Sequence, residues 1–135
     1  MASYHFHLTQ VKRSRGQSVI AQAAYRAGEK LYSTYYGESS DFTRKRGVVM
    51  AEICLPDHAP REYADRETLW NALEWAESGR KAQLAHSFDI TLMNEFSMEE
   101  NIEMVRAFVQ EELVSRGMIA DFAIHDPVRP KGAEP

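Results

Sequence analysis

Hydrophobic residues recur along the chain with two different spacings, one typical of strands and the other of helices. Alternation of apolar and polar positions predicts strands at residues 4–9, 48–55, 85–93 and 118–125. Apolar positions three and four residues apart predict helices at residues 18–30 or 18–31, 65–78 and 97–116. Strands and helices mixed in this order indicate an α/β or α+β domain with helices packed on a sheet.

Polar and glycine residues mark the ends of the predicted helices. Ser18 and Asp65 are plausible N-caps, and Ser97 with Glu100 forms a capping-box pattern. Gly79 and Gly117 stand where the second and third helices should end. The segment from residue 32 to residue 46 is rich in Tyr, Ser, Gly and charge and has no period, which predicts a surface loop.

The size and composition of the chain are typical of one soluble domain. It has 135 residues, of which 44% are hydrophobic and 27% are charged. No apolar stretch approaches the roughly 20 residues of a membrane span, and the N-terminus lacks the pattern of a signal peptide. The single cysteine, Cys54, excludes an internal disulfide framework. We therefore expect a cytoplasmic protein with no membrane partner.

Charge is distributed unevenly along the sequence. Residues 1–47 carry eight basic and three acidic groups, whereas the remainder carries eight basic and 17 acidic groups, for a net charge of −4. A basic third on an acidic body can attract phosphates locally. The alternative is a chance cluster on solvated loops, and charge alone does not decide between the two.

Tyr25 lies on the polar side of the first predicted helix. At about 100° per residue, the side chains of one face point together and Tyr25 lies about 140° away from them, toward water or a cleft. It can be an ordinary surface tyrosine. Its setting suggests more, because Arg26 is adjacent and a basic segment leads into the N-terminus of the helix, where phosphates bind readily. The predicted buried face consists of Ile20, Ala23, Ala24, Ala27 and Leu31.

A phenol is a poor nucleophile at neutral pH because its ordinary pKa is about 10, so attack on phosphorus needs a cation, a metal or a base. His5 and His7 share one face of a predicted strand and could hold a metal together, or simply fill the face of the sheet. His125 stands at the end of another predicted strand. The sequence has no Gly-rich phosphate loop, no HExxH motif and no Cys-rich zinc pattern.

Three short segments carry a family resemblance. They are Met1-Ala2-Ser3-Tyr4-His5-Phe6, Arg15-Gly16-Gln17-Ser18, and Ala23-Ala24-Tyr25-Arg26-Ala27-Gly28-Glu29-Lys30-Leu31. Together they resemble the start of the MobA/MobL relaxases of mobilisable plasmids and conjugative elements. The resemblance continues more loosely through residues 88–92 and 122–125.

The resemblance implies an α+β fold of the HUH-endonuclease type, in which helices flank an antiparallel sheet. It implies that Tyr25 attacks a scissile phosphate of single-stranded DNA at a transfer origin, giving a 5′-phosphotyrosyl enzyme and a free 3′-hydroxyl. His125 falls on the first metal-binding histidine, and Asp89 lies near an acidic position that supports the site. The expected DNA-binding residues, which combine this match with the basic clusters, are Lys12, Arg13, Arg15, Gln17, Arg26, Lys30, Arg44, Lys45 and Arg46.

The sequence departs from the family pattern at the metal site. The family's other two metal ligands form a His-x-His pair about ten residues after the first, and this sequence stops at Pro135 without it. Residues 1–135 are therefore expected to be a relaxase domain incomplete at its C-terminus, unless His5 or His7 completes the site. The expected cofactor is a divalent ion, Mg²⁺ or Mn²⁺, in an incomplete site, because one histidine binds such an ion weakly. The alternative function is a catalytically inactive DNA-binding or interaction module, and accessory mobilisation proteins are further candidate partners.

Overall fold

Strands and helices are mixed along the chain, with three consecutive strands between the first two helices. The computed structural model describes residues 6–12, 18–76, 83–90, 92 and 95–126. The elements in chain order are β1 (Phe6–Lys12), α1 (Val19–Ala27), β2 (Lys30–Ser33), β3 (Glu38–Asp41), β4 (Val48–Cys54), the 3-10 turn η2 (Arg61–Ala64), α2 (Arg66–Ala76), β5 (Gln83–Ile90), α3 (Met98–Glu112), the 3-10 turn η3 (Val114–Arg116) and β6 (Ala120–His125).

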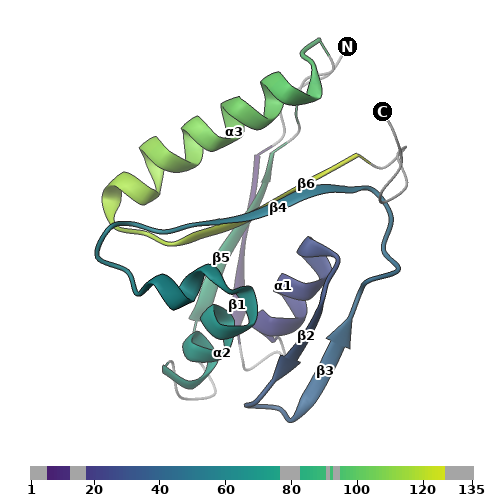
Figure 1. Ribbon diagram of the computed structural model, residues 1–135, viewed down its shortest axis with the longest axis vertical. Coiled ribbons are helices and arrows are strands. Elements are labelled where there is room, and N and C mark those ends of the chain that lie inside the picture. Colours follow the sequence, from purple (N-terminus) through teal and green to yellow (C-terminus); the bar gives the residue numbers. More distant parts are fainter. Residues whose placement is uncertain (1–5, 13–17, 77–82, 91, 93–94, 127–135) are drawn as a thin grey trace.

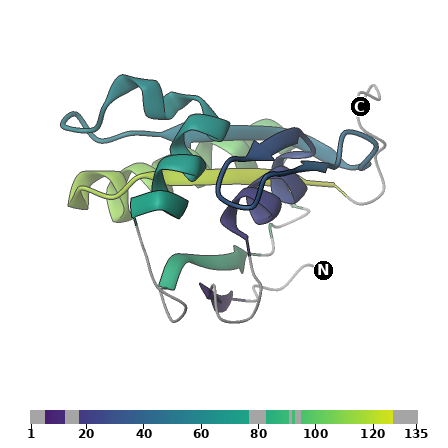
Figure 2. The same cartoon turned by 90° about the horizontal axis from the view of Figure 1, so that it is seen from below.

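All strand pairs in the described part of the chain are antiparallel. β1 pairs with β5, β2 with β3, and β4 with β6, each as a two-stranded ladder. The β4–β6 ladder crosses the molecule with α3 along one side and α1, α2 and the β2–β3 hairpin on the other (Figure 1). The β1–β5 ladder forms a separate layer, as the view from below shows (Figure 2). The predicted α+β architecture with antiparallel strands and flanking helices is confirmed.

Helix α1 buries the alanine-rich face that the sequence predicted. Ser18 caps its N-terminus by accepting a hydrogen bond from Ala21 N (3.2 Å). The helix ends at Ala27, because Gly28 adopts the left-handed conformation (φ 69°), and so it is shorter than the predicted helix to residue 30 or 31. The five residues of its predicted inner face are all buried, and Phe42 and Trp70 pack against this core.

The prediction of a surface loop over residues 32–46 was wrong, because part of this segment forms the β2–β3 hairpin. Leu31 and Ser33 are buried while their neighbours are exposed, the alternation of a strand with one covered face. Gly37 makes the turn with φ 68°, in the left-handed region that glycine adopts without strain. The outer edge of β2 is covered by α2, since Tyr32 N donates to Glu67 Oε1 (2.7 Å).

A second core lies between α3 and the β4–β6 ladder. Val109, Val114 and Ala120 form its buried centre. The predicted capping box is present, because Glu100 N donates to Ser97 Oγ and Ser97 N donates to the side chain of Glu100. α3 ends at Glu112, before the predicted end; η3 follows and Gly117 closes it with φ 88°. In the part of the chain that the model describes, no helix is long and apolar enough to cross a membrane.

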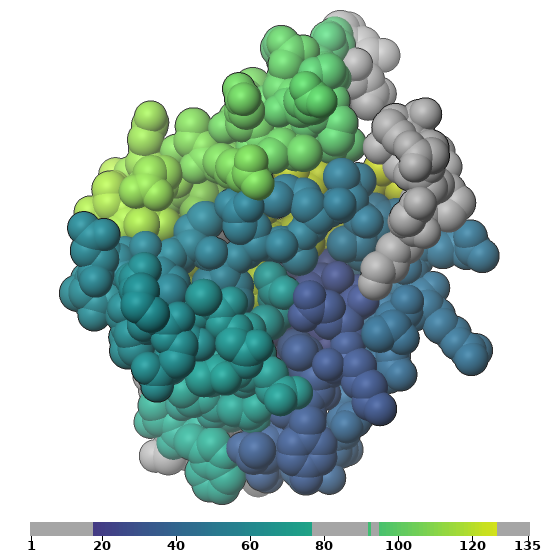
Figure 3. Space-filling model, viewed as in Figure 1, coloured from purple at the N-terminus to yellow at the C-terminus, as the bar shows by residue number. Residues whose placement is uncertain are grey.

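Helix α2 begins at the predicted cap. Asp65 Oδ2 accepts hydrogen bonds from Thr68 N (3.0 Å) and from the Thr68 hydroxyl (2.7 Å). These hydrogen bonds from Thr68 hold the pKa of the Asp65 carboxyl below its ordinary value of 3.8. α2 then runs beside α1 on one face of the molecule (Figure 3).

Asp65→Ala is expected to lower the free energy of unfolding at neutral pH by about 1 kcal/mol, the usual contribution of an N-cap. Because the folded-state pKa is lowered, the ionised carboxylate stabilises above the ordinary pKa, and this contribution is lost as the pH falls through the folded-state pKa. Urea unfolding should therefore show a difference from wild type that shrinks as the pH falls below the ordinary carboxyl pKa of 3.8. Asp57→Ala, an exposed carboxylate in the preceding loop, is the control, and an equal loss in both variants would contradict the cap.

Candidate functional site around Tyr25

Tyr25 stands on the outer face of α1. Its side chain is 54% exposed, as the helical geometry predicted, while Ala23 and Ala24 beside it are buried. The ring of Phe42 lies edge-on to it, with ring centroids 5.2 Å apart. Phe42 follows β3 directly, so the hairpin supports the exposed tyrosine on one side.

The N-terminus of α1 is held by a buried carboxylate from α2. Glu74 is fully buried, and its Oε1 accepts a hydrogen bond from Val19 N (3.2 Å) and one from the Ser18 hydroxyl (3.3 Å). A negative charge at this end complements the helix dipole and satisfies an N–H group that has no helical partner. The start of α1 is thereby fixed against α2.

The C-terminal end of α1 is held by a buried arginine from α2. Arg66 donates two hydrogen bonds through Nε and Nη2 to Asp121 in β6 (2.8 Å each) and one through Nη1 to Glu29 (3.0 Å), just after α1. The side chains of Arg66 and Asp121 are only 9% and 6% exposed. Trp70 Nε1 also donates to Asp121 (2.7 Å). Burial lowers the pKa of Arg66, but the hydrogen bonds and charge of Asp121 and Glu29 outweigh burial and raise it overall.

Lys45 connects Tyr25 with His125. Its ammonium donates to the carbonyl oxygen of Tyr25 (2.7 Å), lies 3.6 Å from the centre of the Tyr25 ring, and is 3.1 Å from His125 Nε2. Burial, and then the nearby charge of Arg26, lower the pKa of Lys45. The fold therefore brings together four predicted site residues from α1, the 43–46 segment and the end of β6: Tyr25, Arg26, Lys45 and His125.

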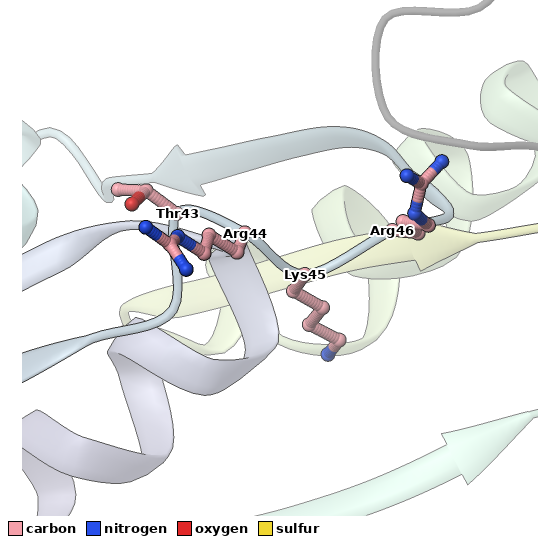
Figure 4. Close-up of a pocket in the computed structure, with 4 residues that line it drawn as sticks. All are labelled: Thr43, Arg44, Lys45 and Arg46. Atoms are coloured by element: carbon pink, nitrogen blue, oxygen red, sulfur yellow. The ribbon is translucent and has the colours of Figure 1, made fainter.

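The segment of residues 43–46, which includes Lys45, lines a surface hollow (Figure 4). It is fixed at its end, because Asp126 N donates to Gly47 O (2.7 Å) beside β6. Arg44 and Arg46 are exposed. The hollow is rich in positive charge, which suits a phosphate-containing ligand.

The other predicted site residues are placed as follows. Lys12 is the last residue of β1, which extends beyond the predicted strand at residues 4–9, and Lys30 is the exposed first residue of β2. Asp89 lies in β5, where its backbone stands opposite His7 of β1. Arg13, Arg15, Gln17 and His5 lie outside the described residues.

Sequence reasoning missed the residues that position Tyr25, namely Glu74, Arg66 and Asp121. One signal could have pointed to Arg66. A positive charge in the first turn of a helix opposes the helix dipole, so an arginine there needs a partner elsewhere in the fold. Nothing in the sequence pattern indicated that Lys45 would meet His125, 80 residues further along the chain.

The described residues do not make a complete metal site. His125 offers one imidazole nitrogen, Nε2, and that atom is 3.1 Å from the Lys45 ammonium. Nowhere among the residues that the model describes do three His, Cys, Asp or Glu side chains gather in a group that could hold a metal. One imidazole beside a cation is a poor ligand set for a divalent ion.

The fold and the site define a class of protein, an α+β domain that presents a tyrosine among cationic side chains. A family model described as "MobA/MobL family" matches residues 17–133. This chain belongs to the MobA/MobL family, as its N-terminal segments indicated. Relaxases of this family are typically metal-dependent.

Relatives and a solved structure agree with this assignment. The chain is 34% identical to "Probable mobilization protein MobA" of Bifidobacterium longum over 93% of its length, and 38% identical to "Conjugal transfer protein TraA" of Rhizobium radiobacter over 93%. It spans only 22% and 12% of those two proteins. A solved structure described as "Molecular Basis of Vancomycin Resistance Transfer in Staphylococcus aureus" shares 34% identity with a TM-score of 0.88, covering 96% of this chain and 66% of the other.

Arg66→Met is expected to lower the free energy of unfolding by about 3–5 kcal/mol, because it leaves the carboxylate of Asp121 buried without a cation. The matched control is Arg106→Met, which breaks the exposed pair of Arg106 with Glu52 (2.7 Å) and should cost much less, because solvent-exposed ion pairs contribute little to stability. Chemical denaturation of both variants measures the difference. Equal losses would show that the buried pair does not hold α2 to β6.

Proposed function

We propose that this chain is the DNA-nicking domain of a mobilisation protein and that Tyr25 is its nucleophile. Membership in the MobA/MobL family supports the class of reaction. The observation that carries the assignment of the nucleophile is the geometry of α1: the helix is held at both ends, and it presents an exposed tyrosine beside Lys45 and His125.

In the proposed reaction, the hydroxyl oxygen of Tyr25 attacks a scissile phosphorus of single-stranded DNA at a transfer origin. The bond from Tyr25 Oη to phosphorus forms as the bond from phosphorus to the 3′-oxygen breaks. The phenol proton ends on the leaving oxygen, giving a free 3′-hydroxyl. One phosphodiester replaces another, so the step needs no external energy and is reversed when the 3′-hydroxyl attacks the phosphotyrosine.

The cations around Tyr25 fit this chemistry, because positive charge stabilises the negative charge that develops on the phosphoryl oxygens. Arg26 is adjacent to Tyr25 in the chain and Arg44 is adjacent to Lys45, and both arginines are proposed to hold the DNA backbone. The basic and polar residues of segment 12–17, with Lys30 and Arg46, remain predicted DNA contacts. Asp89 remains a predicted supporting acid.

A second candidate function is a DNA-binding module without nicking activity. The observation that favours it is the missing ligand set around His125 among the described residues. Binding without chemistry would still use the cations near Tyr25 and would be sensitive to salt. A cytoplasmic location and accessory mobilisation proteins as partners remain predictions in either case.

The two functions are separated by a covalent-adduct assay. The purified chain is incubated, with and without Mn²⁺, with single-stranded oligonucleotides that tile the DNA around its own gene. Label at the 3′-end should migrate with the protein, whereas label at the 5′-end should appear on a shorter free fragment. Tyr25→Phe should abolish the adduct, and Tyr32→Phe, which alters another exposed tyrosine, should leave it unchanged.

An adduct that survives Tyr25→Phe would show that Tyr25 is not the nucleophile. Salt-sensitive binding of the same oligonucleotides with no adduct under either condition would favour the module without nicking activity.

A further inference from the structure

Lys45 differs from Arg44 and Arg46 because its ammonium makes three contacts with other parts of the protein. Its ammonium donates to the carbonyl of Tyr25, lies over the Tyr25 ring and meets His125 Nε2. An ammonium has three N–H donors and a single compact charge, so these contacts occupy most of what it can offer to a ligand. The sequence predicts a phosphate contact for Lys45, whereas these contacts point to a role within the protein.

The contact with Lys45 gives the carbonyl oxygen of Tyr25 a hydrogen-bond donor. Tyr25 lies in the last turn of α1, whose carbonyl oxygens lack the usual helical N–H partners. A cation at this end also complements the negative end of the helix dipole. Lys45 meets both requirements while it reaches the last residue of β6.

Arg44 and Arg46 flank Lys45 and are directed elsewhere. Figure 4 shows the side chains of Lys45 and Arg46 leaving the segment on opposite sides, with Arg44 directed apart from both. Both arginines are exposed, whereas Lys45 is half-buried. Lys45 therefore differs in its surroundings from Arg44 and Arg46, the two exposed arginines on either side of it.

We propose that Lys45 is a positioning residue that fixes the Tyr25 ring relative to His125, and that it does not contact the DNA backbone. This proposal rests on the proposed function, in which Tyr25 attacks DNA. In that reaction, Lys45 acts through Tyr25 and His125: it holds the end of α1 to the end of β6, so the two side chains keep one separation. Arg44, which is exposed, supplies a phosphate contact from the same segment.

The salt dependence of DNA binding tests the division between Lys45 and Arg44. Each backbone contact to single-stranded DNA contributes about 0.7 to the slope of log K against log salt. Arg44→Met should reduce the slope for a single-stranded oligonucleotide by about this amount, and Lys45→Met, which removes the same charge, should leave the slope unchanged. An equal reduction in both variants would overturn the proposal.

The tautomer of His125 gives a second, independent measurement. Because Nε2 faces a donor, the neutral ring should carry its proton on Nδ1 in the wild type. Nitrogen-15 NMR of the histidine-labelled protein, at about pH 8 where a free imidazole is neutral, reports this tautomer. His125→Gln assigns the signal. Lys45→Met should shift it toward the Nε2–H form, whereas no change would contradict the contact.

Rates of adduct formation separate this proposal from the proposed function. At saturating DNA, Lys45→Met should slow the reaction about 10- to 100-fold, because the reacting groups lose their alignment. Arg44→Met should instead raise the DNA concentration needed for half-maximal rate. Chemical restoration of an ammonium, by aminoethylation of Lys45→Cys in a Cys54→Ala background, should recover the rate. A rate unaffected by Lys45→Met would overturn the positioning role, whereas an adduct that survives Tyr25→Phe would overturn the proposed function instead.

Discussion

The buried guanidinium of Arg66 is the constraint on which the rest of the site depends. It binds Asp121 on β6 through two donors and Glu29 after α1 through another, so one side chain joins three elements. Two charges that are nearly removed from water are stable only in close, fully bonded geometry. This requirement fixes the end of α1, which carries Tyr25, against the strand that ends at His125.

The rest of the site is assembled on this frame by segments distant in sequence. Glu74 holds the start of α1, and the β2–β3 hairpin brings Phe42 against the Tyr25 ring. The chain then returns through residues 43–47, where Lys45 reaches both Tyr25 and His125. A tyrosine that is exposed and yet supported at both ends of its helix is suited to attack, because its position is set before DNA arrives.

The sequence was sufficient to predict features that depend on residues close together in the chain. The caps at Ser18 and Ser97, the inner face of α1 and the outward position of Tyr25 all follow from helical geometry and hydrogen bonding within a few residues. The β2–β3 hairpin was missed because its strands have four residues each, too short for a clear alternation. The Arg66–Asp121 pair and the Lys45–His125 contact join residues 55 and 80 positions apart, and no pattern along the sequence encodes such distances.

The most direct test of the central claim is to locate the residue that becomes linked to DNA. Trypsin should release Tyr25 in the peptide of residues 16–26, because arginines stand at 15 and 26, and the tyrosines of the hairpin in the peptide of residues 31–44. After nuclease digestion of the adduct, tandem mass spectrometry should find a nucleotide on Tyr25. A nucleotide on the 31–44 peptide, with residues 16–26 unmodified, would contradict the account.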